Sequence, residues 1–163
     1  MPPTYATTED ARPWAECVGG LILNFGALEF QTLYWIQVLL GEDQALAYRK
    51  KTLSERILTA KTAFLDSAAS NQSKMAAEAL WDEIKAHTKL RNRIAHNPMC
   101  AGRDSVSGEL VWSVIELKKM EPSADNAHER LDFREIQRVA LRVRDINNDL
   151  NELLQDLADV DQG

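Results

Sequence analysis

The chain has 163 residues, of which 45% are hydrophobic and 27% are charged. This length fits one ordinary globular domain with one core, and the composition excludes both a disordered tail and a membrane span. Nineteen lysines and arginines against twenty-five aspartates and glutamates give a formal net charge of −6. A protein whose whole surface binds nucleic acid is therefore excluded, because such a surface is basic.

Two cysteines, Cys17 and Cys100, lie far apart in the sequence, and only His96 is near either of them. This spacing predicts neither a zinc site nor a disulfide framework, so we expect two free thiols, no metal and no other cofactor. The N-terminus lacks a basic segment followed by an apolar one, which is the pattern of a secretory signal. We therefore expect a cytoplasmic protein with no membrane partner.

The first part of the chain predicts two helices. Residues 1–10 carry no periodic pattern and are expected to be flexible, whereas residues 12–40 are mostly apolar and predict a deeply packed helix. Gly41 ends this run. A helical stripe of leucine, isoleucine and phenylalanine then predicts a second helix over residues 43–66, with acidic residues near its start, where the helix dipole favours them.

The second part predicts two more helices with a small β element between them. A third helix is expected over residues 71–97 and should stop there, because the residue before Pro98 avoids the helical region. Residues 98–131 contain a stretch rich in β-branched and aromatic residues, which favours a small hairpin, and the rest of the segment up to Leu131 predicts a loop. Apolar residues with a period near 3.5 predict a long fourth helix over residues 132–160.

These elements predict an all-α fold. Helices joined by short links describe an antiparallel bundle of four to five helices, with a small β-hairpin or extended insertion after the third predicted helix. We expect residues 11–160 to form a single domain.

Two charged residues fall on otherwise apolar helix faces. Arg91 lies in the middle of the stripe that contains Ala77 and Ala95, and Glu29 lies among apolar residues such as Phe25. A lone charge is costly to bury, so each one requires a partner, a wet cleft or a subunit interface. Two interpretations follow: a structural ion pair between Glu29 and Arg91, or a Glu29 that positions Arg91 beside a functional site.

A basic stretch without any acidic residue lies between Ile84 and Arg103. On the third predicted helix its candidate phosphate-binding residues are Lys85, Lys89 and Arg93. Four residues of this stretch share one helix face at spacings of four, three and four: Lys85, Lys89, Asn92 and His96. Such a face suits a phosphate backbone. The alternative is a solvated basic face, which is common on helices.

The segment from Leu90 to Pro98 (LRNRIAHNP) carries the most specific pattern. An arginine, a polar residue directly after it, and a histidine after four intervening positions resemble the R-x4-6-H motif of the HEPN superfamily, whose commonest form has asparagine after the arginine. Asn92 occupies that position. The place of the motif near the end of a long helix in a helical bundle also matches, and the resemblance in fold covers roughly residues 11–160.

The resemblance implies a metal-independent endoribonuclease that is a homodimer, in which Arg91, Asn92 and His96 of two subunits meet. The supporting role of Glu29 follows separately, from its charge on an apolar helix face. Chemistry gives an independent reason for the dimer, since RNA cleavage through the ribose 2′-hydroxyl uses both a base and an acid. One chain offers one suitable histidine, because His87 lies about 13 Å from His96 along a helix that rises about 1.5 Å per residue. Arg91 would stabilise charge on the phosphorus, and Asn92 would orient the phosphate or His96.

Helical geometry raises one difficulty for this site. Arg91 and His96 are five residues apart, and so about 140° apart around a regular helix, which weakens a site on one helix alone. Unwinding of the helix end before Pro98, or a site shared across a twofold axis, would remove the difficulty.

Three functions follow from the sequence. The preferred one is a homodimeric endoribonuclease that acts on RNA as a toxin or phage-defence effector. The second is a non-catalytic helical module that binds nucleotide or RNA, or that has an antitoxin or a nucleotidyltransferase as its partner. The third is a structural dimer held by the apolar first helix. The four tryptophans are expected to be core or interface anchors. Trp112 is the one tryptophan that we also consider as a contact for substrate or for a second subunit.

Overall fold

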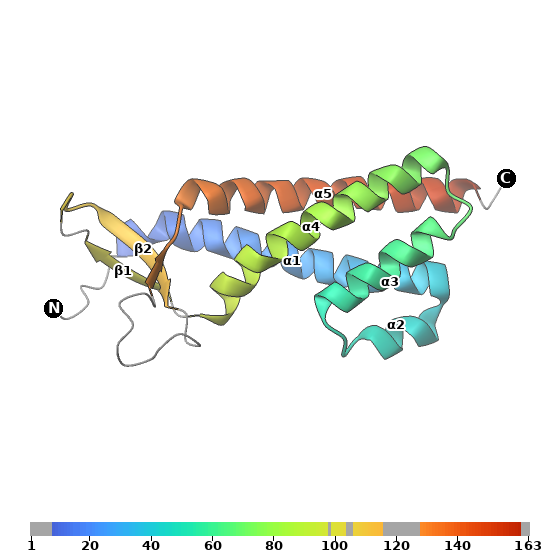
Figure 1. The fold of residues 1–163 in the computed structure, drawn as a ribbon, viewed down its shortest axis with the longest axis horizontal. Helices are drawn as coiled ribbons and strands as arrows, with labels where there is room; N and C mark the ends of the chain where they lie inside the picture. The colour runs from blue at the N-terminus through green and yellow to red at the C-terminus, as the bar shows by residue number, and fades with distance from the viewer. Residues whose placement is uncertain (1–7, 98, 104–105, 116–127, 161–163) are drawn as a thin grey trace. The chain divides into compact units, whose positions relative to one another are not determined.

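A computed structural model describes residues 8–97, 99–103, 106–115 and 128–160. This part of the chain is mostly helical and includes a small three-stranded antiparallel sheet (Figure 1). None of its helices is both long and apolar enough to span a bilayer. In chain order the elements are α1 (Thr8–Leu40), α2 (Glu42–Tyr48), α3 (Leu53–Leu65), α4 (Asn71–His96), β1 (Met99–Arg103), β2 (Leu110–Ile115), β3 (His128–Arg130) and α5 (Phe133–Val160).

The chain divides into two compact units. The first unit contains Met1–Ile22 and Thr88–Leu141, and the second contains Leu23–His87 and Arg142–Gly163. The three strands and the C-terminal part of α4 therefore belong to the first unit, whereas α2 and α3 belong to the second.

The predicted mostly helical chain with a small β insertion after the third predicted helix is confirmed. The helices predicted over residues 71–97 and 132–160 correspond to α4 and α5 to within one residue at each end. The expected start of the first helix is wrong, because α1 begins at Thr8 and residues 8–10 are helical. Residues 1–7 of the segment expected to be flexible lie outside the described residues. Pro13 lies inside α1.

The prediction of one helix over residues 43–66 is also wrong. Thr52 separates α2 from α3 and has an extended backbone, with ψ of 157°. Its side chain accepts a hydrogen bond from the Glu55 backbone N–H, and its own N–H donates to the Glu55 carboxylate at 2.8 Å. This reciprocal capping box starts a new helix. The apolar stripe seen in the sequence therefore continues over two helices.

The sheet has the order β1-β2-β3, and β2 pairs antiparallel with both neighbours. Gly108 lies before β2 with φ of 71°, a left-handed conformation that glycine adopts without a steric penalty. Val114 on β2 is fully buried and lies opposite Glu129 on β3. The expected loop is therefore wrong for residues 128–130, because this short strand is specified by pairing with β2 and not by its own composition. Residues 116–127 of the same predicted segment lie outside the described residues.

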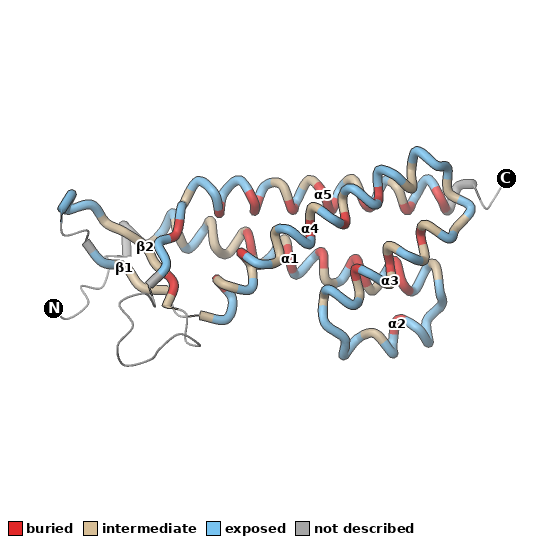
Figure 2. Tube along the Cα trace, viewed as in Figure 1, coloured by how far each residue is buried: buried red, intermediate tan, exposed pale blue. Residues whose placement is uncertain are grey.

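Trp35 is central to the core of the second unit. Its side chain is fully buried, and its ring centroid lies 4.7 Å from that of Phe64 on α3 and 5.4 Å from that of Trp81 on α4. The rings of Trp35 and Trp81 meet edge to face, which is a favourable arrangement of aromatic quadrupoles. Figure 2 shows buried residues recurring along these helices. Trp35 and Trp81 are thus core residues, as predicted.

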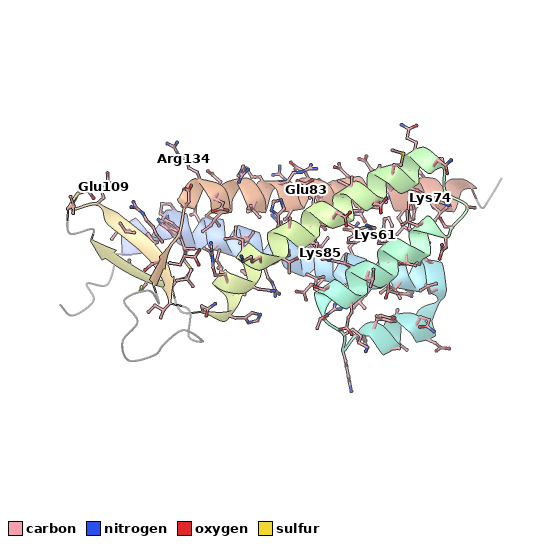
Figure 3. All side chains as sticks on the ribbon, viewed as in Figure 1. Lys61, Lys74, Glu83, Lys85, Glu109 and Arg134 are labelled. Carbon is pink, nitrogen blue, oxygen red and sulfur yellow. The ribbon has the colours of Figure 1, made fainter. Side chains whose placement is uncertain are left out.

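Ion pairs join neighbouring helices of the second unit. Lys61 on α3 lies 3.0 Å from Glu78 and 3.0 Å from Asp82, both on α4. Arg142 on α5 donates two hydrogen bonds to Glu83 on α4, at 2.8 and 2.7 Å. Figure 3 labels Lys61 and Glu83 on their helices. The Arg142 guanidinium, through these hydrogen bonds and its charge, lowers the pKa of Glu83 below its ordinary value.

Replacing Glu83 by Gln should lower the free energy of unfolding at neutral pH by less than about 1 kcal/mol, because both partners are more than a third exposed. A lowered carboxyl pKa stabilises the folded state above the ordinary glutamate value of about 4.3, and this contribution is lost as pH falls through the lowered pKa. Glu83→Gln should therefore lose less stability on acidification than the wild type, measured by chemical denaturation across that range. Glu152→Gln, at an exposed position on α5, serves as the control. Equal acid dependence in Glu83→Gln and wild type would contradict the expectation.

Candidate functional site

The motif residues lie on the last two turns of α4. The helix is continuous through His96, and Leu90 and Ile94 are buried and anchor it within the first unit. Arg91 is half-buried, whereas Asn92 and His96 are exposed. The helix ends directly after the motif, where the Asn97 side chain donates to the Arg93 carbonyl at 2.8 Å. Ala95, which the sequence placed on the apolar stripe, is exposed.

Arg91 and Asn92 form a hydrogen-bonded pair. The guanidinium Nη1 of Arg91 donates to Asn92 Oδ1 at 3.0 Å. The asparagine that follows the arginine therefore orients the arginine itself, and not His96. Because Asn92 is exposed, this contact holds the guanidinium end of the half-buried Arg91 side chain near the surface.

His96 has an exposed ring, which has no hydrogen-bond partner within the described part of the chain. Since α4 remains helical from Arg91 to His96, these two side chains leave the helix about 140° apart around its axis. Unwinding of the helix before His96, one of the two ways to bring the pair together, does not occur. A single α4 therefore does not direct both side chains at one phosphate.

Arg93 is engaged in an ion pair. Its guanidinium Nη1 contacts Glu129 Oε1 on β3, and its side chain is only 19% exposed. The contact ties the end of α4 to the sheet of the first unit. Arg93, predicted as a phosphate-binding residue, therefore has a structural partner in this unit.

The other predicted residues divide between the two units. Lys89 is exposed on α4 in the first unit. Lys85, which is labelled in Figure 3, is exposed on α4 in the second unit. Glu29 is half-buried on α1 in the same unit. The backbone carbonyl of Glu29 accepts hydrogen bonds from Thr32 at 2.8 Å and from Arg56 at 3.4 Å. The pairing of Glu29 with Arg91 stays a prediction.

A second histidine of α4 belongs to a cluster that the sequence did not indicate. His87 Nε2 lies 3.6 Å from Glu83 Oε1, and Glu83 also binds Arg142 on α5. Glu83 and Arg142 are 59 residues apart, so no local pattern connects them. His87 is thus a structural neighbour of an ion pair.

Aromatic rings gather beside the sheet in the first unit. Trp112 on β2 stacks on Trp14 of α1 with ring centroids 5.3 Å apart, and Trp14 also meets Phe133 edge to face at 5.1 Å. These residues line an open pocket with Leu110 and Arg130. Trp14 and Trp112 therefore anchor the sheet to two helices, which agrees with the expected anchoring role of tryptophan.

No protein-family model matches the chain, and neither a curated protein nor a solved structure similar to it was found. Among the described residues, no group of three or more His, Cys, Asp or Glu side chains lies close enough together to hold a metal ion. The geometry of the α4 motif is therefore the principal guide to function.

The contrast between Arg93 and Lys89 is testable. Arg93→Met should lower Tm by about 2–4 °C, because it removes an ion pair of about 1 kcal/mol. Lys89→Met should leave Tm unchanged, since Lys89 is exposed on the same helix. Thermal unfolding of both variants checks this. Glu129→Gln should reproduce the loss seen with Arg93→Met, and the double variant should add little to it. Equal destabilisation by Lys89→Met would contradict a structural role specific to Arg93.

Proposed function

We propose that the chain is a metal-independent endoribonuclease of HEPN type that acts as a homodimer in the cytoplasm. The proposed fold is an antiparallel bundle of four to five helices. The observation that carries the proposal is the hydrogen-bonded Arg91–Asn92 pair followed by the exposed His96, at the end of a long helix. An arginine held in place by a hydrogen bond and an exposed histidine on the same helix are residue types that a reaction at a phosphate uses.

The proposed reaction uses the RNA as its own nucleophile. A base removes the proton of the ribose 2′-hydroxyl, the 2′-oxygen forms a bond to the adjacent phosphorus, and the bond to the 5′-oxygen breaks. An acid protonates the departing 5′-oxygen, so the products are a 2′,3′-cyclic phosphate and a 5′-hydroxyl. Arg91 stabilises the charge that develops on the phosphorane oxygens, and Asn92 keeps the guanidinium in place.

A second subunit supplies what one chain lacks. The reaction needs a base and an acid, and His96 is the exposed histidine of the motif. The regular helix also turns His96 away from Arg91 of the same chain. In a twofold dimer, two copies of His96 serve as base and acid, and Arg91 of either chain reaches the phosphate. Lys85 and Lys89 extend the contact to neighbouring phosphates, because both are exposed on α4.

RNA cleavage by the purified protein in EDTA tests the nuclease. The wild type should cut a mixed RNA and leave 2′,3′-cyclic phosphate ends, whereas His96→Ala and Arg91→Ala should each lower the rate by about a hundredfold or more. His87→Ala, the same change on the same helix, should retain activity. Circular dichroism confirms that the variants are folded. No cleavage by the wild type, or equal cleavage by His96→Ala, would sink the proposal; RNA binding without cleavage would favour the non-catalytic module.

Subunit mixing tests whether two copies of His96 share one site. Wild type and His96→Ala are mixed in equal amounts and allowed to exchange subunits. If each reaction needs both histidines, about one quarter of the dimers remain active, whereas independent sites would retain about one half of the activity. A retained half would exclude the two-histidine mechanism while leaving a one-chain nuclease possible.

A further inference from the structure

α1 has an exposed apolar face within the second unit. Its large side chains and their exposed fractions are Leu23 at 74%, Phe30 at 72%, Tyr34 at 46% and Val38 at 47%. Together with the exposed Ala27 they recur at spacings of four, three, four and four residues, so they form one stripe along the helix. Single exposed apolar residues are ordinary, but a continuous apolar stripe indicates an interaction site.

Two open grooves flank the ridge formed by Phe30 and Tyr34. One lies between α1 and α2, where Leu46 and Arg49 line it. The other lies between α1 and α5, and its α5 wall is polar, with Arg144, Asn147, Asn148 and Asn151. An apolar ridge with polar edges has the anatomy of a protein interface, in which a hydrophobic centre is surrounded by a polar rim.

The stripe contains a gap in side-chain size. Gly26 and Ala27 are small and exposed, they lie between the large Leu23 and Phe30, and a Cβ added at Gly26 would meet open space. A twofold axis perpendicular to α1 between residues 28 and 29 makes two copies of the helix antiparallel. Phe30 of one copy then faces the small Ala27 of the other, and Tyr34 faces Leu23. The three- and four-residue spacing is that of a seam between two helices.

The face is also large enough for a symmetric pair. Five large side chains at least 46% exposed lie on or beside it: Leu23, Phe30, Tyr34, Val38 and Leu46. At about 100 Å² from each, two copies bury about 1,000 Å² in total, the size at which specific interfaces begin.

We propose that this face of α1, formed by Leu23, Ala27, Phe30, Tyr34 and Val38, is the surface through which two copies of the chain associate in antiparallel orientation. The inference rests on the proposed function only for the requirement of a twofold partner. The surface itself follows from the exposure, spacing and size pattern of these residues.

Light scattering tests the surface. The wild type should have the mass of a dimer, and Phe30→Lys should shift it towards the monomer, with the apparent Kd raised at least about thirtyfold, as for a central aromatic anchor. Met75→Lys is the matched control, because Met75 is 73% exposed in the same unit but lies on α4. It should remain dimeric. A monomeric wild type at high micromolar concentration, or an unchanged mass for Phe30→Lys, would overturn the proposal.

Cross-linking tests the orientation, in a background where Cys17 and Cys100 are replaced by Ser. Leu23→Cys combined with Tyr34→Cys should give a disulfide-linked dimer under mild oxidation. The two positions are eleven residues apart, about 16 Å along one helix, so they cannot bridge within one chain. Each single variant should remain uncross-linked, because equivalent positions are distant in an antiparallel pair. Efficient cross-linking by the single variants would overturn the antiparallel arrangement.

These outcomes separate the surface from the nuclease. A cross-linked dimer that does not cleave RNA would keep the surface and overturn the nuclease. An active nuclease whose Phe30→Lys variant stays dimeric would overturn the surface and keep the nuclease.

Discussion

The regular turn of an α-helix is the constraint on which the functional geometry of this chain depends. Each residue of α4 advances about 100° around the axis, and the helix keeps this geometry through His96. Arg91 is consequently half-buried beside the inward-facing Leu90 and Ile94, while His96 is exposed. Two side chains that a short motif places together in the sequence are thus held apart in one chain. In the homodimer that we propose, a twofold partner would resolve this separation with no change in the fold of either subunit.

Long-range ion pairs change the meaning of the charge pattern. The basic stretch around Arg93 has no acidic residue in the sequence, but Glu129 arrives from β3 and engages that arginine. Lys61, in the second unit, is likewise bound by acids of a neighbouring helix. Fewer basic side chains of α4 are exposed than the number of lysines and arginines in its sequence implies. Lys85 and Lys89 are two of the exposed ones. For the RNA contact that we propose, binding of a few phosphates therefore fits these exposed side chains better than binding along a long basic track.

α1 shows why an apolar run does not by itself specify burial. Its sequence predicts a deeply packed helix, yet Phe30 is 72% exposed while the polar Gln31 is buried. The Gln31 amide is satisfied by the Asn147 carbonyl at 3.1 Å and by the Asn151 side chain at 2.8 Å, so its burial carries no unpaired amide nitrogen. The helix therefore has one face packed by its own unit and another that remains apolar and available. In the dimer that we propose, this second face gives the apolar character of α1 a role in association.

The sequence by itself determined the features that depend on near neighbours. The periodicity of apolar residues predicted α4 and α5, and the motif that ends in His96 was visible because all its residues lie on one helix. The capping box at Thr52 was also local, but a continuous apolar stripe concealed it. Candidate residues could thus be identified, although not their surroundings.

Only the tertiary structure decided which residues are satisfied, buried or exposed. The pairing of β3 with β2, the contact between Arg93 and Glu129, and the bidentate pair of Glu83 with Arg142 all join segments distant in the sequence. The exposed face of α1 emerged in the same way, because the packing of the other helices selects which apolar face is covered. Long-range contacts leave no periodic signal in the chain, since each is set by the fold and not by the spacing of its residues.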